Sequence, residues 1–305
     1  MDSLHFQEKL VAHLEKEFKF KIVSIETPPQ GMSSSVFFIT TSDNKEYAVK
    51  YGNDAMKDVP ALDLISRKHI DIPVPALFSS FIFEGIPVVI LERVRFPLLE
   101  SVPVEEMSKY VPSMIENLRR LHAIKSEFPG PLDRSNSTKT WKEMMLEIFT
   151  DEFDWNEVAN REGLDKDLIL ISVKKMIQKI NDTAFDNHEY SLLHTDFNQR
   201  NLFVNPQSHK IAGIIDWEDA MFGDPIYDFA RVRMYLWHFN LGDHAVKEYY
   251  ELLNFSSEQK KLEDLYWLSR VIQYLVWYSE ELNEFNTGRI KLHQDYLRTY
   301  EWYKV

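Results

Sequence analysis

Strand patterns fill the first third of this chain and helix patterns fill the remainder, and this order restricts the fold more than any other feature of the sequence. Five short stretches are rich in β-branched and aromatic residues and are bounded by turn residues, which is typical of strands. They span residues 20–27, 34–41, 45–50, 76–83 and 86–92. Because these strands are segregated from the helices that follow, the sequence predicts an α+β fold.

Apolar residues recur at helical intervals once before the strands and repeatedly after them. The segment 4–18 has this spacing, and so does the stretch between Lys50 and residue 72. Beyond Arg93, helices are predicted over residues 104–123, 138–149 and 166–182, with several more from residue 225.

The stretch "RFPLLESVPV" at residues 95–104 separates the strand-rich part from the helix-rich part. Its prolines interrupt both the strand and the helix periodicity. A chain of 305 residues is also long for one hydrophobic core. We therefore predict a β-rich N-terminal lobe of residues 1–93, a mainly helical C-terminal lobe of residues 94–305, and a hinge at about residues 91–103.

Composition excludes several classes of protein. The chain has no cysteine, so disulfides, thiolate metal sites and cysteine nucleophiles are excluded. Its net charge is −13 and it has no long run of Lys or Arg, which argues against nucleic acid as a partner. The start "MDSLHFQEKL" lacks the pattern of a secretion signal, and no apolar stretch is long enough to cross a membrane. The expected location is the cytoplasm, and the oligomeric state is left open.

The stretch "LLHTDFNQRNLFV" at residues 192–204 places polar residues between two apolar, strand-like flanks, which is typical of a loop that carries a site. Asp216 follows the apolar run 211–215 and so lies at the end of another strand. Asn201 and Asp216 supply the hard oxygen ligands that Mg²⁺ prefers. Asp196 is then left to accept a proton from a hydroxyl, and the three residues match the template for phosphoryl transfer.

Two segments, "HTDFNQRN" and "IIDWEDAMFGDPIYDFA", resemble the aminoglycoside phosphotransferase family. Together with "TWKEMMLEIF", these segments are most similar in sequence to the hygromycin B phosphotransferases. The resemblance implies a two-lobed, protein-kinase-like fold, Mg²⁺ as cofactor, and ATP or GTP as donor. It also implies that Asp196 is the catalytic base and that Asn201 and Asp216 bind the metal, in agreement with the roles read from the residues.

The first lobe is then expected to bind the nucleotide. Lys50 ends "EYAVK", which is close to the V-A-I-K signature, and a lysine there reaches the phosphates. Ser33, Ser34 and Ser35 lie in "GMSSS" and are candidates to cover the phosphates, although an ordinary hairpin loop looks the same. The segment "VVILERV" resembles the one that joins the lobes, with a base edge bound by the backbone from Glu92 to Val94.

Lys50 needs an acidic partner, and here the sequence departs from the family pattern. No glutamate occurs between Glu46 and Glu84. Asp58 is the best substitute, because it precedes the apolar residues of the next helix at the offsets that the family's acid has. An N-cap ahead of Pro60 explains Asp58 equally well. Asp54 and Asp63 are further candidates.

Several other side chains near these motifs are candidates for a structural role, a substrate contact, or either. Asp224 before Pro225, and Asp228 after it, fit the start of a helix. Glu218 and Asp219 follow the predicted metal ligand directly, and are candidates to hold ammonium groups of a substrate or are solvated surface acids. Three aromatic residues are candidates for a sugar pocket or for the core, namely Tyr235, Trp237 and His238.

These residues predict a kinase that transfers the γ-phosphoryl group of a nucleoside triphosphate to a hydroxyl of a small molecule. The acidic C-terminal part mildly favours a cationic acceptor, and the resemblance implies an aminoglycoside such as hygromycin B, as in antibiotic resistance. A kinase for choline, homoserine or a fructosamine fits the same residues. Two further alternatives are a catalytically silent nucleotide-binding protein and a metal-dependent phosphohydrolase.

Overall fold

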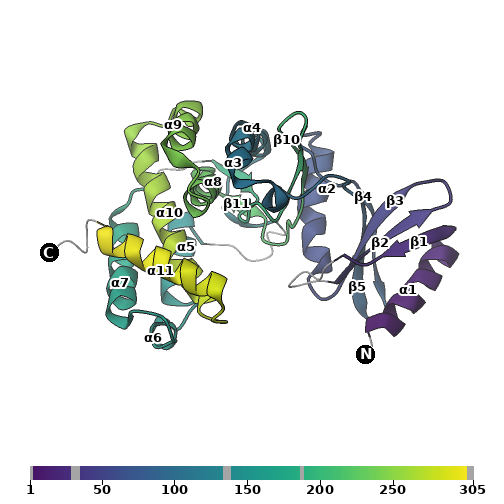
Figure 1. Cartoon of the computed structure of the whole chain (residues 1–305), viewed down its shortest axis with the longest axis horizontal. Helices are drawn as coiled ribbons and strands as arrows, with labels where there is room; N and C mark the ends of the chain where they lie inside the picture. Colours follow the sequence, from purple (N-terminus) through teal and green to yellow (C-terminus); the bar gives the residue numbers. More distant parts are fainter. Residues whose placement is uncertain (1–2, 29–34, 133–138, 186–188, 301–305) are drawn as a thin grey trace. The chain divides into compact units, whose positions relative to one another are not determined.

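The computed structural model describes residues 3–28, 35–132, 139–185 and 189–300. The chain forms two compact units, which we describe separately (Figure 1). Unit 1 consists of Met1–Ile124 and Asp196–Ala220, and unit 2 consists of Lys125–Thr195 and Met221–Val305. The predicted hinge at residues 91–103 lies within unit 1, and the boundary between the lobes stays a prediction.

A five-stranded antiparallel sheet with the order β1-β2-β3-β5-β4 forms the N-terminal part of unit 1. Each strand lies where the alternating pattern predicts one, so the β-rich first third is confirmed. The strands are β1 (Ile22–Glu26), β2 (Ser35–Thr41), β3 (Glu46–Tyr51), β4 (Leu77–Phe83) and β5 (Ile86–Glu92).

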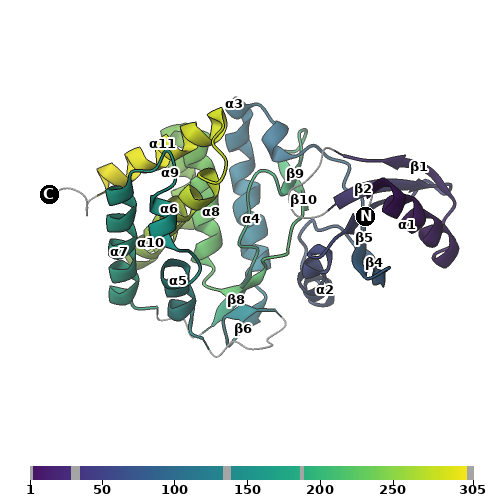
Figure 2. The ribbon, with the colours of Figure 1, turned by 90° about the horizontal axis from the view of Figure 1, so that it is seen from below.

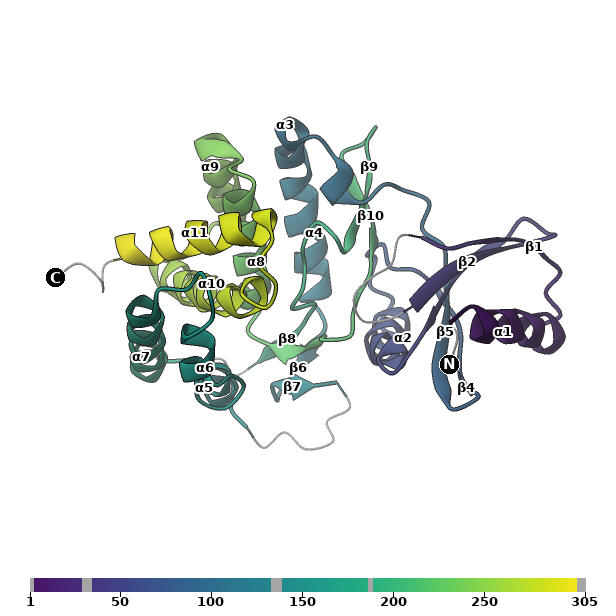
Figure 3. The same ribbon diagram turned by 60° about the horizontal axis from the view of Figure 1, so that its bottom comes forward.

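Helix α1 (Ser3–Glu17) lies beside this sheet, as Figures 1 and 3 show. Phe6, Leu10 and Leu14 recur every four residues and so share one face of the helix. All three are buried, together with sheet residues such as Phe37 and Val49. Burial of each such side chain stabilises the fold by about 1.5–3 kcal/mol, which explains why this face of the sheet is covered.

The remainder of unit 1 contains short helices and a second pair of strands. The helical elements are η1 (Ala55–Asp58), α2 (Val59–Arg67), η2 (Leu99–Ser101), α3 (Val104–Met107), η3 (Ser108–Tyr110) and α4 (Val111–Leu121). The continuous helix predicted over residues 104–123 is wrong, because η3 interrupts it. Pro112, in the first turn of α4, has no N–H to donate to the carbonyl four residues earlier, so the α-helical ladder breaks there.

Strands β9 (Leu202–Asn205) and β10 (Lys210–Ile214) pair antiparallel in unit 1. Gly213 in β10 lies close to Val94, which follows β5. A Cβ added at Gly213 would be 2.8 Å from Val94 Cγ1. This close approach requires a residue without a side chain.

Unit 2 combines a small sheet with most of the described helices. Its strands are β6 (Lys125–Ser126), β7 (Gly130–Pro131), β8 (Tyr190–Leu193) and β11 (Met221–Gly223), in the order β6-β8-β11-β7. Its helices are α5 (Trp141–Thr150), α6 (Trp155–Ala159), α7 (Lys166–Asp182), α8 (Ile226–His238), α9 (Gly242–Leu253), α10 (Ser257–Tyr278) and α11 (Glu284–Thr299). The predicted helix over residues 166–182 is confirmed at both ends.

Helix α10 packs against α7, α8 and α11, and these helices enclose the core of unit 2 (Figures 2 and 3). Trp141 lies in this core and donates from Nε1 to Tyr266 Oη at 2.7 Å. Helix α5 starts at Trp141 because Thr140, at the N-cap, and Glu143, in the first turn, form a capping box. Among the described helices, none is both long and apolar enough to cross a membrane.

Candidate active site

Lys50 is the centre of a buried cluster of charges in unit 1. It lies in β3 between Val36 of β2 and Val89 of β5, and only 9% of its surface is exposed. Its Nζ is 2.8 Å from Asp58 Oδ2 and 3.6 Å from Asp216 Oδ1. The fold therefore places the predicted nucleotide-binding lysine beside the predicted metal ligand.

Asp58 uses both of its carboxylate oxygens in this cluster. While Oδ2 accepts from Lys50, Oδ1 accepts from the backbone N–H of Trp217 at 2.9 Å. Asp58 also precedes α2 at the N-cap position, but its side chain makes no capping hydrogen bond. Of the two readings that the sequence left open, the structure supports the ion pair.

Burial and pairing act on the pKa values of this pair in opposite directions. For Lys50, burial lowers the pKa, but the negative charge of Asp58 and its hydrogen bond raise it, and the net direction is upward. The ammonium form of Lys50 is thereby favoured. For Asp58, burial is the largest influence and raises the pKa of the carboxyl group, against the lowering effect of Lys50.

Asp196 and Asn201 are joined by direct hydrogen bonds within the loop between β8 and β9. Asn201 Nδ2 donates to the backbone carbonyl of Asp196 at 2.9 Å and to its Oδ2 at 2.8 Å. Pairing of β9 with β10 brings the ends of both strands together, and the Ile215 N–H donates to the carbonyl of Asn201 at 3.0 Å. Asp216 is the next residue and has a positive φ of 68°, which is strained for a residue with a side chain.

The side-chain oxygens of Asn201 and Asp216 are suitable ligands for a magnesium ion. Because both N–H bonds of the Asn201 amide point toward Asp196, the amide oxygen is the atom left to act as a ligand. Asp216 contributes carboxylate oxygens, and 35% of its side chain is exposed. In the described residues, no group of three or more His, Asp or Glu side chains could hold a metal. Mg²⁺ needs few protein ligands, since water and phosphate oxygens complete its shell.

Asp228 is a residue of this region whose role the sequence did not reveal. Within unit 2 its carboxylate accepts from the backbone N–H groups of His194 and Thr195, each at 2.9 Å. Asp228 was predicted only as an acid in the first turn of a helix, which it also is. Because a carboxylate in that turn is a common helix signal, no local pattern connects Asp228 with residues more than thirty positions earlier.

The residues predicted to bind the rest of the nucleotide are placed only in part. Ser33 and Ser34 lie outside the described residues, and Ser35 starts β2 opposite Tyr51. Glu92 ends β5, and its N–H donates to the carbonyl of Ala76 at 2.9 Å. Val94 follows the strand and packs on Gly213. Nucleotide contacts for these residues stay predictions.

Glu218 and Asp219 lie beside the charge cluster of unit 1. One oxygen of Glu218, Oε2, is buried and has no hydrogen-bond partner among the described residues. Burial raises the pKa of Glu218, and the negative charge of Asp216 raises it further. Asp219 is exposed. An acid that lacks a partner here is consistent with a ligand contact, although its role as a substrate residue stays a prediction.

The three candidates for a sugar pocket lie on α8 in unit 2. Tyr235 is buried and Trp237 packs against the core. His238 Nε2 lies 2.8 Å from His293 Nε2, and His293 Nδ1 lies 2.8 Å from the carbonyl of Val271. Because a carbonyl only accepts, His293 is protonated on Nδ1, and His238 therefore donates from Nε2 to His293. Packing explains these positions, and a substrate role for them stays a prediction.

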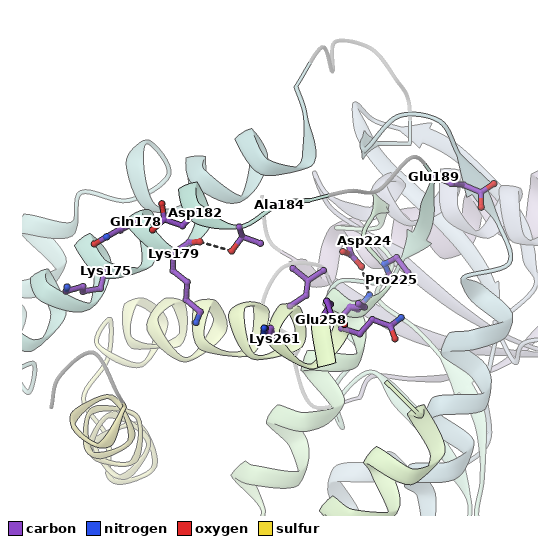
Figure 4. Close-up of a pocket in the computed structure, with 14 residues that line it drawn as sticks. Lys175, Gln178, Lys179, Asp182, Ala184, Glu189, Asp224, Pro225, Glu258 and Lys261 are labelled. Carbon is purple, nitrogen blue, oxygen red and sulfur yellow. Dashed lines mark hydrogen bonds between the residues drawn. The ribbon is translucent and has the colours of Figure 1, made fainter. Parts of the chain in front are cut away.

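A cavity of about 780 Å³ opens in unit 2 between α7, the first turn of α10 and the start of α8 (Figure 4). Both lysines and acids line it, among them Lys179, Lys261 and Glu258. Asp224 lies at one end, where Oδ1 accepts from the Ile226 N–H and Oδ2 accepts from Tyr266 Oη, each at 2.9 Å. The predicted start of α8 is wrong by one position, because the helix begins at Ile226 and Pro225, not Asp224, is at its N-cap. Asp224 still accepts from the first N–H of the helix, from one residue farther away.

Comparison with known proteins identifies the class to which this fold and site belong. The model of a phosphotransferase enzyme family, abbreviated APH, matches residues 24–261. A thermostable mutant of the aminoglycoside phosphotransferase APH(4)-Ia, in a ternary complex with ADP and hygromycin B, has the same fold at a TM-score of 0.73 and 17% identity. The match covers 94% of this chain and 96% of that one.

A second solved structure is APH(2'')-IIIa in complex with GDP and kanamycin. Its TM-score is 0.64 at 15% identity, and the match covers 95% of this chain and 97% of that one. Among curated proteins, acyl-CoA dehydrogenase family member 11 of Rattus norvegicus is 26% identical over 174 residues. Those residues are 54% of this chain but 21% of the rat protein, so the chain spans about a fifth of that relative.

The fold is therefore the α+β fold predicted from the order of strands and helices, and it is the kinase-like one that the family resemblance implied. The chain belongs to the APH phosphotransferase enzyme family, whose model matches most of its length. Both the family and the reaction class predicted from residues 192–230 are confirmed.

Proposed function

We propose that this enzyme transfers the γ-phosphoryl group of ATP or GTP to a hydroxyl of a small cationic acceptor, with an aminoglycoside as the first acceptor class to test. The observation that carries the proposal is the cluster in unit 1, where Lys50 lies 2.8 Å from Asp58 and 3.6 Å from Asp216. Such a cluster supplies a fixed cation next to a metal ligand, as phosphoryl transfer requires.

In this mechanism Lys50 binds the phosphates of the nucleotide, and Asp58 keeps its ammonium group charged and in place. Asn201 and Asp216 would hold Mg²⁺, which neutralises phosphate charge when it is bound. Asp196 orients the acceptor hydroxyl and accepts its proton. The hydrogen bonds from Asn201 Nδ2 to the carbonyl and Oδ2 of Asp196 fix the direction of that carboxylate.

Two further acids near this cluster, Glu218 and Asp219, support a cationic acceptor. Glu218 has a buried oxygen without a partner in the described structure, and Asp219 is exposed beside it. Either carboxylate would bind an ammonium group of an acceptor. Aminoglycosides are present in the two solved structures named above, which is why they come first among cationic acceptors.

Choline, homoserine and fructosamine kinases stay as alternatives, because the same residues suit any small hydroxyl acceptor. A catalytically silent protein is disfavoured by the ion pair that Asp58 forms with Lys50 in place of a glutamate. The phosphohydrolase alternative is disfavoured by that lysine, which suits a nucleotide better than a simple phosphate ester. The predicted cytoplasmic location stays a prediction.

The test is a mass-spectrometric assay of phosphate transfer from ATP and from GTP to hygromycin B, kanamycin, choline, homoserine and a fructosamine. A mass gain of one phosphate on one of these acceptors, absent with Asp196→Ala, would support the proposal and identify the acceptor. Hydrolysis of the nucleotide without transfer to any acceptor in the panel would contradict the proposed acceptor class.

A further inference from the structure

Thr195, the residue before the proposed catalytic base, has a left-handed backbone conformation with a φ of 63°. This conformation is rare for residues other than glycine and is least favourable for β-branched ones such as threonine. It costs on the order of 1–3 kcal/mol and persists only where neighbouring groups hold it. Thr195 is buried, so those groups must come from the protein around it.

Two side chains of unit 2 hold the peptide groups on either side of Thr195. Asp228 of α8 accepts from the N–H of Thr195 at 2.9 Å, which fixes the preceding peptide. Arg270 of α10 donates from a terminal guanidinium nitrogen to the carbonyl of Thr195 at 3.0 Å. That carbonyl belongs to the same peptide group as the backbone nitrogen of Asp196. Its position therefore sets the direction in which the chain enters the next residue.

Arg270 is itself held in place, but not by an acid. Its guanidinium lies 4.5 Å from the centre of the Tyr227 ring, and Tyr227 is the neighbour of Asp228 in α8. Among the described residues, Arg270 forms no ion pair with a carboxylate, and its buried Nε has no hydrogen-bond partner. An unsatisfied buried donor is costly and uncommon. A purely structural arginine gains little from such an arrangement, because its one polar bond is to a strained peptide.

We propose that Arg270 is a positioning residue for the catalytic step. It holds the peptide between Thr195 and Asp196 in the left-handed turn, and the turn aims the Asp196 carboxylate at the acceptor hydroxyl. This inference rests on the proposed role of Asp196 as the base. A shift of about 1 Å in a reacting group can lower the rate about 100-fold, so the restraint matters more for turnover than for binding.

The test compares Arg270→Met, which keeps the volume of the side chain but removes its donors, with Arg270→Lys, which keeps one charged donor. Arg161→Met is the matched control, since Arg161 also donates to a backbone carbonyl in unit 2, that of Val276 at 3.0 Å. We expect Arg270→Met to lower kcat by about 10- to 100-fold and to leave both KM values within about threefold. Arg270→Lys should recover part of kcat, and Arg161→Met should retain it.

Hydrogen exchange gives a second readout that needs no acceptor. We expect the amides of His194 and Thr195 to exchange about tenfold faster in Arg270→Met than in wild type or Arg161→Met. Unchanged exchange would overturn the positioning role whatever the effect on kcat, and faster exchange with unchanged kcat would overturn it as well. If the wild-type enzyme transferred phosphate to no acceptor, the proposed function would fail, while exchange would still decide whether Arg270 holds this peptide.

Discussion

At the scale of single residues, Asp58 is the acid that pairs with Lys50, in a stretch of the sequence that contains no glutamate. Its backbone stands at the N-cap position of α2, while its carboxylate is shared between Lys50 and the N–H of Trp217. Because Trp217 follows Asp216 in the chain, Asp58 connects the lysine with the predicted metal ligand. The sequence raised Asp58 as a partner but left an N-cap equally open, since both readings require the same residue in the same place.

The ion pair is testable by Asp58→Asn, because the amide oxygen still accepts from Trp217, while the amide NH2 cannot accept from Lys50, so the charge and that hydrogen bond are lost together. Lys50 would then be buried with Asp216 as its remaining partner at 3.6 Å. We expect the free energy of unfolding to fall by about 2 kcal/mol and nucleotide binding to weaken about fivefold or more. Denaturant titration and calorimetric binding of MgATP measure both effects. Asp58→Glu is the control, and equal behaviour of the two variants would argue against a role for the charge.

At the scale of elements, alternation and turn residues were enough to predict all five strands of the first sheet and the helix over residues 166–182. These elements are coded locally, by side-chain period and by caps. The proximity of Asp196, Asn201 and Asp216 was also predictable, because each lies directly beside an apolar, strand-like run, but their roles stay predictions. By contrast, the braces of the loop come from α8 and α10, far along the chain. Nothing in the local pattern of Asp228 or Arg270 indicates the peptide of Thr195.

Close packing of β10 gives an element-scale prediction for Gly213→Ala. The added Cβ would lie 2.8 Å from Val94 Cγ1 and 3.2 Å from Phe203 Cβ. Val94 must then move, and we expect the free energy of unfolding to fall by about 1–3 kcal/mol. Because Val94 is predicted to bind the base, the KM for nucleotide should rise as well.

Gly288→Ala in α11 is the matched control for Gly213→Ala. An added Cβ there has no atom within 4 Å, so the change should stabilise the helix by about 0.5–1 kcal/mol. Thermal unfolding of both variants decides the point. A Gly213→Ala protein as stable as wild type would show that the contact with Val94 is not tight.

At the scale of the whole molecule, a buried histidine pair couples the stability of unit 2 to pH. Burial is the main cause that lowers the pKa of His238 to about 2 and that of His293 to about 4. Nearby arginines add to both effects. Since both folded pKa values lie below the ordinary value of 6.5, stability is complete above pH 6.5 and is lost as pH falls below it.

As pH falls from 7.5 to 5.5, each histidine of the pair should lower the free energy of unfolding by about 1.4 kcal/mol. The reason is that the histidine binds a proton over this range in the unfolded chain but not in the folded one. Replacing His293 by glutamine should therefore reduce the loss of stability over this range by about 1–2 kcal/mol. The exposed His244 provides the control variant His244→Gln. Chemical unfolding at the two pH values measures the effect, and an identical loss in both variants would contradict it.

The proposed role of Asp196 is tested most directly by the turnover of the Asp196→Ala variant with the acceptor found in the panel. The affinity of the same variant for the nucleotide is measured alongside. If Asp196 is the base held between Asn201 and the turn at Thr195, kcat should fall by about 100-fold or more. The dissociation constant of the nucleotide should stay within about threefold, because Lys50, Asn201 and Asp216 are intact. Turnover within a few-fold of wild type would remove Asp196 from the mechanism and contradict the proposed function of this site.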